Sequence, residues 1–152
     1  MQTTSAKAIV THPFNVSAEQ IFDAWLDPKM IARFMFGPSV RPNESIIHLR
    51  NDPRVNGTFS YLVKRGDTEI NHIGTYTKIE RPGTLAFTWA VAGQGDSSDV
   101  IIQVIANPSG CVATLAHEMQ PQWAEFVSKI EGSWRSMMEH LDRVFKEQGD
   151  ML

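Results

Sequence analysis

Four side chains in the middle of the sequence, Tyr61, His72, Tyr76 and Trp89, are able to exchange protons or hydrogen bonds with a bound molecule. A histidine has an ordinary pKa of about 6.5, so modest changes in its surroundings switch its charge near neutral pH. His72 is therefore a candidate acid–base group or ligand anchor, and the tyrosines are candidate hydrogen-bond donors. The structural alternative is a core histidine bonded to Tyr61 or to the backbone, with rings that only fill space.

These residues belong to a larger set that strand geometry would gather on one surface, because residues two apart in a strand share a side. That side collects Phe59, Tyr61, Val63, Ile70, His72, Gly74, Tyr76, Leu85, Phe87, Trp89 and Val91. The opposite side is mostly Thr, Ser, Ala, Asn and Lys. An ordinary core needs only aliphatic residues, so rings with polar tips on this face indicate the wall of a small-molecule pocket.

Six strands must position this face, separated by short turns rich in Gly, Asp, Asn and Pro. Their expected ranges are residues 44–50, 58–64, 68–80, 84–92, 99–106 and 111–119. If the turns that join the second, third and fourth of these strands have two residues each, Tyr61 lies opposite His72 and Tyr76 opposite Trp89. A slip of one residue would exchange the two faces, so the pocket wall depends on those turns.

The last hairpin turns at Pro108-Ser109 and adds a second candidate histidine, His117, to the same wall. Its more apolar side holds Val100, Ile102, Val104, Ala113, Leu115, His117 and Met119. A satisfied core histidine is the alternative for His117.

Helices are expected at both ends of this meander. A strand from Ala6 to Phe14 is followed by Ser17 and Gln20, which form the capping box of a first helix with Trp25 on its apolar stripe. Pro28 opens a second short helix, whose buried side includes Phe34. Apolar residues at helical spacing from residue 125 to about 147 predict a long amphipathic C-terminal helix. Its stripe comprises Phe126, Ile130, Trp134, Met137, Met138, Leu141, Val144 and Phe145.

Gly132 interrupts this C-terminal helix at a cost of about 1 kcal/mol relative to Ala, which suggests either a close approach to the sheet or a bend. The aromatic and methionine side chains Trp25, Trp89, Trp134, Met137 and Met138 line a cavity in one interpretation and fill the core in the other.

Composition describes one soluble globular domain over residues 1–147, with a flexible tail at 148–152. The chain has 152 residues, of which 42% are hydrophobic and 20% charged. A net charge of -3 argues against nucleic-acid binding, and no apolar run approaches the ~20 residues that span a membrane. The start MQTTSAKAIV lacks the basic and apolar regions of a signal peptide, so a cytoplasmic location is expected.

No recognised catalytic or metal-binding motif is present in the sequence. The five histidines, His12, His48, His72, His117 and His140, are scattered, and no HExxH or CxxC pattern accompanies them. GxSxG, P-loop and GxGxxG patterns are also missing, and the only cysteine, Cys111, has no obvious activating partner. We therefore expect no metal, no cofactor and no catalytic residues.

An ordered series of short segments gives the chain a family resemblance from about Ala8 to Phe145. The series contains Phe22-Asp23-Ala24-Trp25, Asp27-Pro28, Phe34-x-x-Gly37-Pro38, Asp52-Pro53-Arg54-Val55, Gly57-x-Phe59, His72-Ile73-Gly74-Thr75-Tyr76, Glu80-Arg81-Pro82, Phe87-Thr88-Trp89, Leu115-x-His117-Glu118 and Gly132-Ser133-Trp134. It resembles the homologues of the heat-shock-protein-90 ATPase activator, within the START-like SRPBCC superfamily.

This resemblance implies an α+β helix-grip fold of the START or Bet v 1 type: a curved antiparallel sheet of about seven strands wraps the long C-terminal helix, and two short helices lie between strands 1 and 2. It also implies a cavity between sheet and helix that suits hydrophobic or amphipathic ligands, but no shared reaction. The activator itself has an additional chaperone-binding domain, and we expect that these 152 residues have no room for one.

The leading hypothesis is a non-enzymatic protein that binds a small hydrophobic or amphipathic molecule. Its expected ligand-binding residues are Trp25, Phe34, Phe59, Tyr61, His72, Tyr76, Phe87, Trp89, His117, Trp134 and Met138. One alternative is a cyclase- or hydrolase-like enzyme that uses the same cavity, with His72 and a tyrosine moving protons. Another is a module that docks a chaperone or other protein, and homodimerisation through a sheet edge or the helix also stays open.

Overall fold

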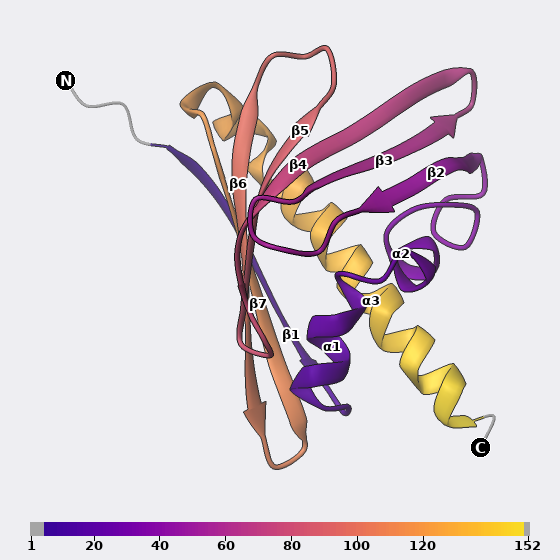
Figure 1. The fold of residues 1–152 in the computed structure, drawn as a ribbon, viewed down its shortest axis with the longest axis vertical. Helices are drawn as coiled ribbons and strands as arrows, with labels where there is room; N and C mark the ends of the chain where they lie inside the picture. The colour runs from indigo at the N-terminus through magenta and orange to yellow at the C-terminus, as the bar shows by residue number, and fades with distance from the viewer. Residues whose placement is uncertain (1–4, 151–152) are drawn as a thin grey trace.

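The computed structural model describes residues 5–150, which form one curved sheet of seven strands and three α-helices (Figure 1). The strands are β1 (Ala6–Phe14), β2 (Glu44–Asn51), β3 (Thr58–Arg65), β4 (Thr68–Glu80), β5 (Thr84–Val91), β6 (Ser97–Asn107) and β7 (Gly110–Met119). The helices are α1 (Ala18–Ala24), α2 (Pro28–Phe34) and α3 (Val127–Asp150), and a 3₁₀ helix, η1 (Pro121–Phe126), precedes α3. The helix-grip architecture predicted from the sequence is confirmed, with strand ends within two residues of the expected positions.

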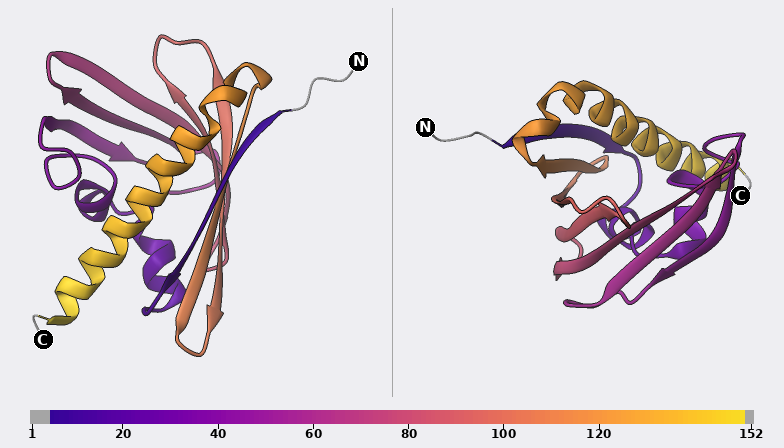
Figure 2. Two further views of the ribbon diagram at one scale, coloured as in Figure 1. Left: turned by 180° about the vertical axis from the view of Figure 1, so that it is seen from behind. Right: turned by 90° about the horizontal axis from the view of Figure 1, so that it is seen from above.

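The sheet is antiparallel throughout and has the order β1-β7-β6-β5-β4-β3-β2, so β2 to β7 form the predicted meander. Strands β1 and β2 lie at opposite edges, and α1 and α2 connect them. Figure 2 shows that the sheet bends around one side of the molecule and that α3 crosses its concave side.

Local sequence explains where the two connecting helices begin. The Ser17 side chain accepts a hydrogen bond from the Gln20 backbone N–H, and the Gln20 side chain accepts one from the Ser17 N–H, which completes the predicted capping box. The Asp27 carboxylate caps α2 through the Lys29 N–H at 2.9 Å, with Pro28 in the first turn. Trp25, at the end of α1, and Phe34, at the end of α2, are both buried, and their ring centroids lie 5.0 Å apart.

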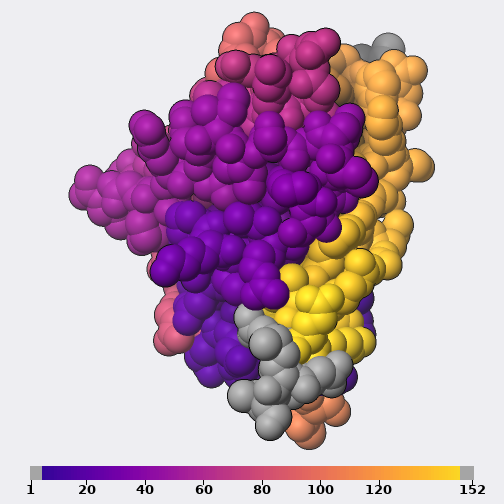
Figure 3. Space-filling view, turned by 90° about the vertical axis from the view of Figure 1, so that its right-hand side faces the viewer, coloured from indigo at the N-terminus to yellow at the C-terminus, as the bar shows by residue number. Residues whose placement is uncertain are grey.

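Helix α3 begins after a single 3₁₀ segment and runs to Asp150, so part of the expected tail is helical and residues 151–152 lie outside the described residues. Its apolar stripe buries Trp134, Met137, Met138, Leu141 and Val144. The helix packs mainly on β1 and α2, and in the space-filling view its yellow C-terminal part lies against the purple segments of the first third of the chain (Figure 3).

Two neighbouring residues of α3, Glu131 and Gly132, concern the fit of the helix to the sheet. Its Glu131 carboxylate accepts a hydrogen bond of 2.9 Å from the Ile9 N–H and thereby occupies a donor on edge strand β1. A Cβ atom built on Gly132 meets no atom within 4 Å, so the close approach to the sheet that Gly132 suggested is wrong. No described helix is both long and apolar enough to cross a bilayer.

The register of the meander confirms one predicted pair and corrects the other. Tyr61 lies opposite His72, as the two-residue turn predicts. Tyr76 lies opposite Phe87 rather than Trp89, because the loop after Glu80 has three residues instead of two and a bulge follows between Tyr76 and Lys78. Each irregularity moves the register by one residue in the same direction, so together they move it by two and every ring keeps its predicted face.

The concave face forms the core together with the helices. The buried part of the predicted wall comprises Phe59, Tyr61, Val63, His72, Tyr76, Leu85 and Phe87, whereas Trp89 is half-buried. All seven residues expected on the apolar side of the last hairpin, including His117, are buried as well. Gly74 lies within this wall, and a Cβ atom there would come 2.4 Å from the Phe59 ring, so glycine makes room for that ring.

Candidate functional site

An open cavity of about 290 Å³ lies between the sheet, the start of α3 and the loop that follows α2. We call it the open cavity. Its apolar lining includes Phe36, Trp89, Met119, Trp123, Ile130, Trp134 and Met137. Its polar lining includes Arg41, Arg65, His72, Asp96, Ser98, Ser133 and His117. A concave space lined by aromatic and other apolar side chains, with polar groups that can orient a ligand, is typical of a small-molecule site.

The eleven residues predicted from the sequence fall into three groups. His72, Trp89, His117 and Trp134 line the open cavity. Trp25, Phe59, Tyr61, Tyr76 and Phe87 surround, with Met35 and Trp89, a separate void of only about 10 Å³. Phe34 and Met138 line neither space and are fully buried in the core. The structure therefore brings four of the predicted residues together at a usable cavity.

The tyrosines in the deep part of the concave face bind one another. The Tyr61 and Tyr76 hydroxyls lie 3.2 Å apart, and the Asn51 side-chain amide donates to the Tyr76 hydroxyl at 3.1 Å. The same amide donates to the Leu26 carbonyl at 2.7 Å. Burial raises the pKa of both tyrosines above the ordinary value. Both hydroxyls have partners inside the protein, so they resemble structural groups more than ligand anchors.

His117 is held by hydrogen bonds on both ring nitrogens. The Trp134 indole N–H donates to His117 Nδ1 at 3.1 Å, so the proton of the neutral ring must sit on Nε2. That Nε2 lies 2.7 Å from the Ser98 hydroxyl, which in turn donates to the Trp89 carbonyl at 2.9 Å. Burial lowers the pKa of His117 to about 4, which keeps the ring neutral at physiological pH. This series of hydrogen bonds connects Trp134 to the Trp89 backbone and fixes two residues that line the open cavity.

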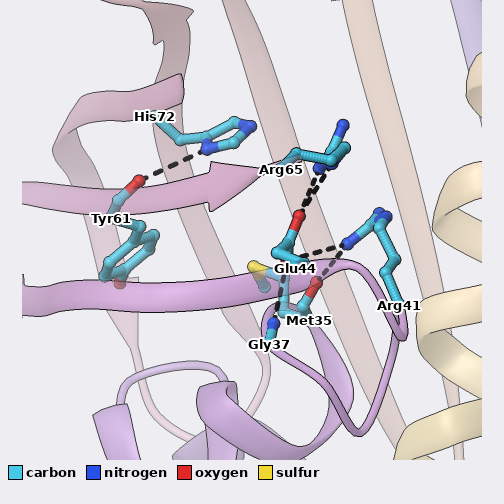
Figure 4. Close-up of polar contacts among 7 residues, drawn as sticks. All are labelled: Met35, Gly37, Arg41, Glu44, Tyr61, Arg65 and His72. Atoms are coloured by element: carbon cyan, nitrogen blue, oxygen red, sulfur yellow. Dashed lines mark hydrogen bonds and ion pairs between the residues drawn. The ribbon is translucent and has the colours of Figure 1, made fainter. Parts of the chain in front are cut away.

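Within the described residues, His72 has a hydrogen-bond partner on only one ring nitrogen, whereas His117 has a partner on both. Its Nδ1 lies 3.3 Å from the Tyr61 carbonyl oxygen, which can only accept, so Nδ1 carries the proton (Figure 4). Burial lowers the pKa of His72 to about 4, with a smaller contribution from the positive charge of Arg65. The ring packs against Phe36 and Trp89, with centroid distances of 4.6 and 5.4 Å. A neutral His72 therefore offers Nε2 as an acceptor on the cavity wall.

One group of charged residues at the cavity was missed by sequence reasoning. Glu44 is 2% exposed, and its carboxylate accepts hydrogen bonds from the Gly37 N–H at 2.8 Å and from Arg65 Nε at 2.8 Å (Figure 4). Arg65 Nη2 lies 2.7 Å from the same carboxylate, and Arg41 Nη1 lies 3.4 Å from its other oxygen. Glu44 and Arg65 are the first cross-strand pair of the β2–β3 hairpin, so their opposite charges at the two hairpin ends were the available signal.

Metal and thiol chemistry find no support in the described part of the chain. Residues 5–147, whose side chains are described, contain no group of three or more His, Cys, Asp and Glu side chains that could hold a metal ion. Cys111 is completely buried, and burial raises the pKa of its thiol, which disfavours the reactive thiolate.

The fold and the cavity together define a helix-grip protein, in which a curved sheet and a long C-terminal helix enclose a pocket. Residues 15–146 match the family described as Activator of Hsp90 ATPase homolog 1-like protein, and the chain belongs to this family. No curated protein matches the chain.

Solved structures of bacterial proteins share the fold at low sequence identity. The AHSA1-like protein from Aeromonas hydrophila is 21% identical, with a TM-score of 0.78 and coverage of 94% of each chain. A protein from Nitrosomonas europaea is 14% identical, with a TM-score of 0.80 over 95% of this chain and 97% of its own. A protein from Rhodobacter sphaeroides is 16% identical, with a TM-score of 0.82 and coverage of 93% of each chain.

Proposed function

We propose that this protein binds one small hydrophobic or amphipathic molecule in the open cavity and does not transform it. The observation that carries the proposal is the contrast between two parts of one concave face. The deep part is packed down to a void of about 10 Å³, whereas about 290 Å³ stays open beside Trp89 and Trp134. The aromatic side chains that line an open cavity lose unfavourable contact with water when an apolar body fills it.

The two cavity histidines support binding more than catalysis. A general base works best when its pKa lies near the working pH, and both His72 and His117 have pKa values lowered to about 4 by burial. His117 also has both nitrogens occupied by Trp134 and Ser98. His72 retains one accepting nitrogen on the wall, which suits it to orient a ligand hydroxyl or amide rather than to carry protons.

The proposal can be tested by filling the cavity from an exposed position. Ser133 is an exposed residue of α3 that lines the open cavity, so Ser133→Trp would place an indole in the binding space without removing a core residue. Ser136 is also exposed on the same helix and does not line the cavity, so Ser136→Trp is the matched control. Native mass spectrometry and tryptophan fluorescence with lipid extracts would report binding.

We expect extract-derived ligands to bind the parent chain and Ser136→Trp, and Ser133→Trp to lose at least about tenfold in affinity, equivalent to 1.4 kcal/mol. Circular dichroism and thermal unfolding would establish that both variants are folded. Equal ligand binding by the two folded tryptophan variants would refute the open cavity as the binding site. A reaction product formed by the parent chain and lost in His72→Phe would instead favour the enzymatic alternative.

A further inference from the structure

We infer that the ligand is a singly charged anionic amphipath, whose carboxylate-like group binds at Arg41 and Arg65 and whose apolar body lies against Phe36, Trp89 and Trp134. This inference rests on the proposed function, because it assigns the ligand class of the same cavity. The two arginines, called here the arginine pair, come from the loop after α2 and from the end of β3. Both line the cavity.

The arginine pair carries more positive charge than Glu44 neutralises. Among the described residues, Glu44 is the one carboxylate that bridges the pair, and its side chain is 0% exposed. Arg41 and Arg65 remain 27% and 34% exposed, so parts of both guanidinium groups reach the cavity. Two guanidinium groups and one buried carboxylate leave a net charge of about one positive unit, since arginine stays protonated in proteins.

The guanidinium groups also keep unused donors. Arg65 contacts Glu44 through Nε and Nη2, and Arg41 contacts Glu44 and the Met35 carbonyl through Nη1. Within the described residues these contacts leave Nη1 of Arg65 and both Nε and Nη2 of Arg41 without a hydrogen-bond acceptor. Charge-assisted hydrogen bonds from arginine to a carboxylate are among the stronger polar contacts in proteins, so this arrangement selects an anion.

The remaining titratable groups at the cavity restrict the charge of that anion. His72 and His117 are neutral, and they add no positive charge at neutral pH. Asp96, from the turn between β5 and β6, also lines the cavity and lies 3.4 Å from the Trp123 indole N–H. This carboxylate would repel a second negative charge on the ligand, so the cavity favours a monoanion.

The volume of the cavity limits the apolar body. A space of about 290 Å³ is about ten times the ~30 Å³ that one water molecule occupies in the liquid. A ligand of about ten to fifteen non-hydrogen atoms therefore fills it, such as a medium-chain fatty acid or an aryl carboxylate. The aromatic wall accepts a flexible chain or a ring, so the anionic group is the part that the structure specifies.

Three probes with the same chain and different head groups test this assignment: decanoate, decanol and decyltrimethylammonium. Calorimetry at about pH 8, where a carboxylic acid is ionised, would use probe concentrations below micelle formation. We expect decanoate to bind about tenfold or more tighter than decanol, and the cation to bind more weakly than decanol. Added salt should weaken decanoate binding and leave decanol binding nearly unchanged.

Arg41 is the better position for a variant, because Arg65 still pairs with Glu44 when Arg41 is replaced. We expect Arg41→Met to lose most of the preference for decanoate and Arg41→Lys to retain part of it. Arg54→Met is the control, since Arg54 is 77% exposed, pairs with Asp52 and does not line the cavity. Thermal unfolding would identify any variant that loses its fold.

Glu44→Gln should change decanoate affinity in the direction opposite to that of Arg41→Met. The glutamine can still accept the hydrogen bond from the Gly37 N–H, but it removes the negative charge from between the arginines. Decanoate affinity should then rise by about threefold or more, whereas a purely structural role of Glu44 would lower it. A folded Glu44→Gln protein with weaker decanoate binding would overturn the assignment.

The probes also separate failure of this inference from failure of the proposed function. Equal affinity for decanoate and decanol, or tighter binding of the cation, would overturn the anionic assignment while leaving a ligand-binding cavity. Absence of binding by all three probes to the folded chain would overturn both. Decanoate preference that persists in Arg41→Met and falls in Arg54→Met would place the anion elsewhere and overturn the assignment.

Discussion

Acidification should destabilise this protein through His117, and the size of the effect follows from its surroundings. The folded chain holds His117 neutral with a pKa of about 4, because the ring is 5% exposed and Nδ1 accepts from Trp134. The unfolded chain has the ordinary pKa of about 6.5 and binds a proton more readily. The contribution of His117 to stability is therefore complete above pH 6.5 and is lost as the pH falls toward 4.

The difference between pKa values of 6.5 and about 4 corresponds to about 3 kcal/mol, at about 1.4 kcal/mol for each pH unit. His72 has a pKa lowered to the same value and adds a second loss over the same interval. Together they represent a large fraction of the ~5–15 kcal/mol that stabilises a typical domain. The protein should therefore be markedly less stable near pH 4 than at neutral pH in the absence of any ligand.

Urea unfolding followed by tryptophan fluorescence at about pH 7, 6, 5 and 4 would measure this dependence. The comparison variant is His117→Gln, which keeps polar side-chain atoms but cannot titrate. Between about pH 7 and pH 4 the parent chain should lose about 3 kcal/mol more than the variant. Identical pH profiles for the two proteins, or an NMR titration of the His117 ring with a midpoint near its ordinary value, would refute the reasoning.

The remaining predictions concern packing and capping and are measured by thermal or urea unfolding. Gly132→Ala should stabilise the protein by about 0.5–1 kcal/mol, because a Cβ atom there meets open space within a helix; a destabilised variant would contradict that. Gly74→Ala should cost about 1–3 kcal/mol, because its Cβ would overlap a β5 carbonyl at 2.0 Å, and an unchanged melting temperature would be inconsistent with it. Tyr76→Phe should destabilise the protein by about 1 kcal/mol more than Tyr61→Phe, because of the two hydroxyls only that of Tyr76 also accepts a hydrogen bond from an amide. A larger effect of Tyr61→Phe would contradict this. Ser17→Ala should cost about 1 kcal/mol through loss of the helix cap, and an effect below about 0.3 kcal/mol would mean that the cap is redundant.

Most of the fold was predictable because burial alternates along the strands and recurs along the helices. Buried residues recur at every second position in β6 and β7 and at every third or fourth position in α3. Each pattern indicates which side of the element faces the core. The caps at Ser17 and Asp27 are local hydrogen bonds, so the sequence around them suffices to predict them. The loop after Glu80 was mispredicted, because its length depends on how two strands meet rather than on its own residues.

The position of the open cavity was not predictable from the strand pattern. Phe59, Tyr61 and Tyr76 lie on the same face as His72 and Trp89. The first three are nevertheless covered by side chains of the segment that contains α1 and α2, among them Trp25 and Met35. Which part of a concave face is filled depends on side chains that are remote in sequence. The buried Glu44 was missed for the same reason, since its burial follows from contacts with the α2–β2 loop and the end of β3.

The irregular β4–β5 hairpin has a consequence for how this chain tolerates insertions and deletions. Its three-residue loop and the bulge at residue 77 each shift the register by one residue, and together they leave the inward side of both strands intact. Deleting Thr77 alone would leave Ile79 opposite Leu85 and Tyr76 opposite Phe87, so the hairpin would become regular and the inward side of both strands would be kept. The bulge is therefore a position at which this hairpin accepts a single-residue deletion, so related sequences are expected to lack residue 77 without a change in the pocket wall.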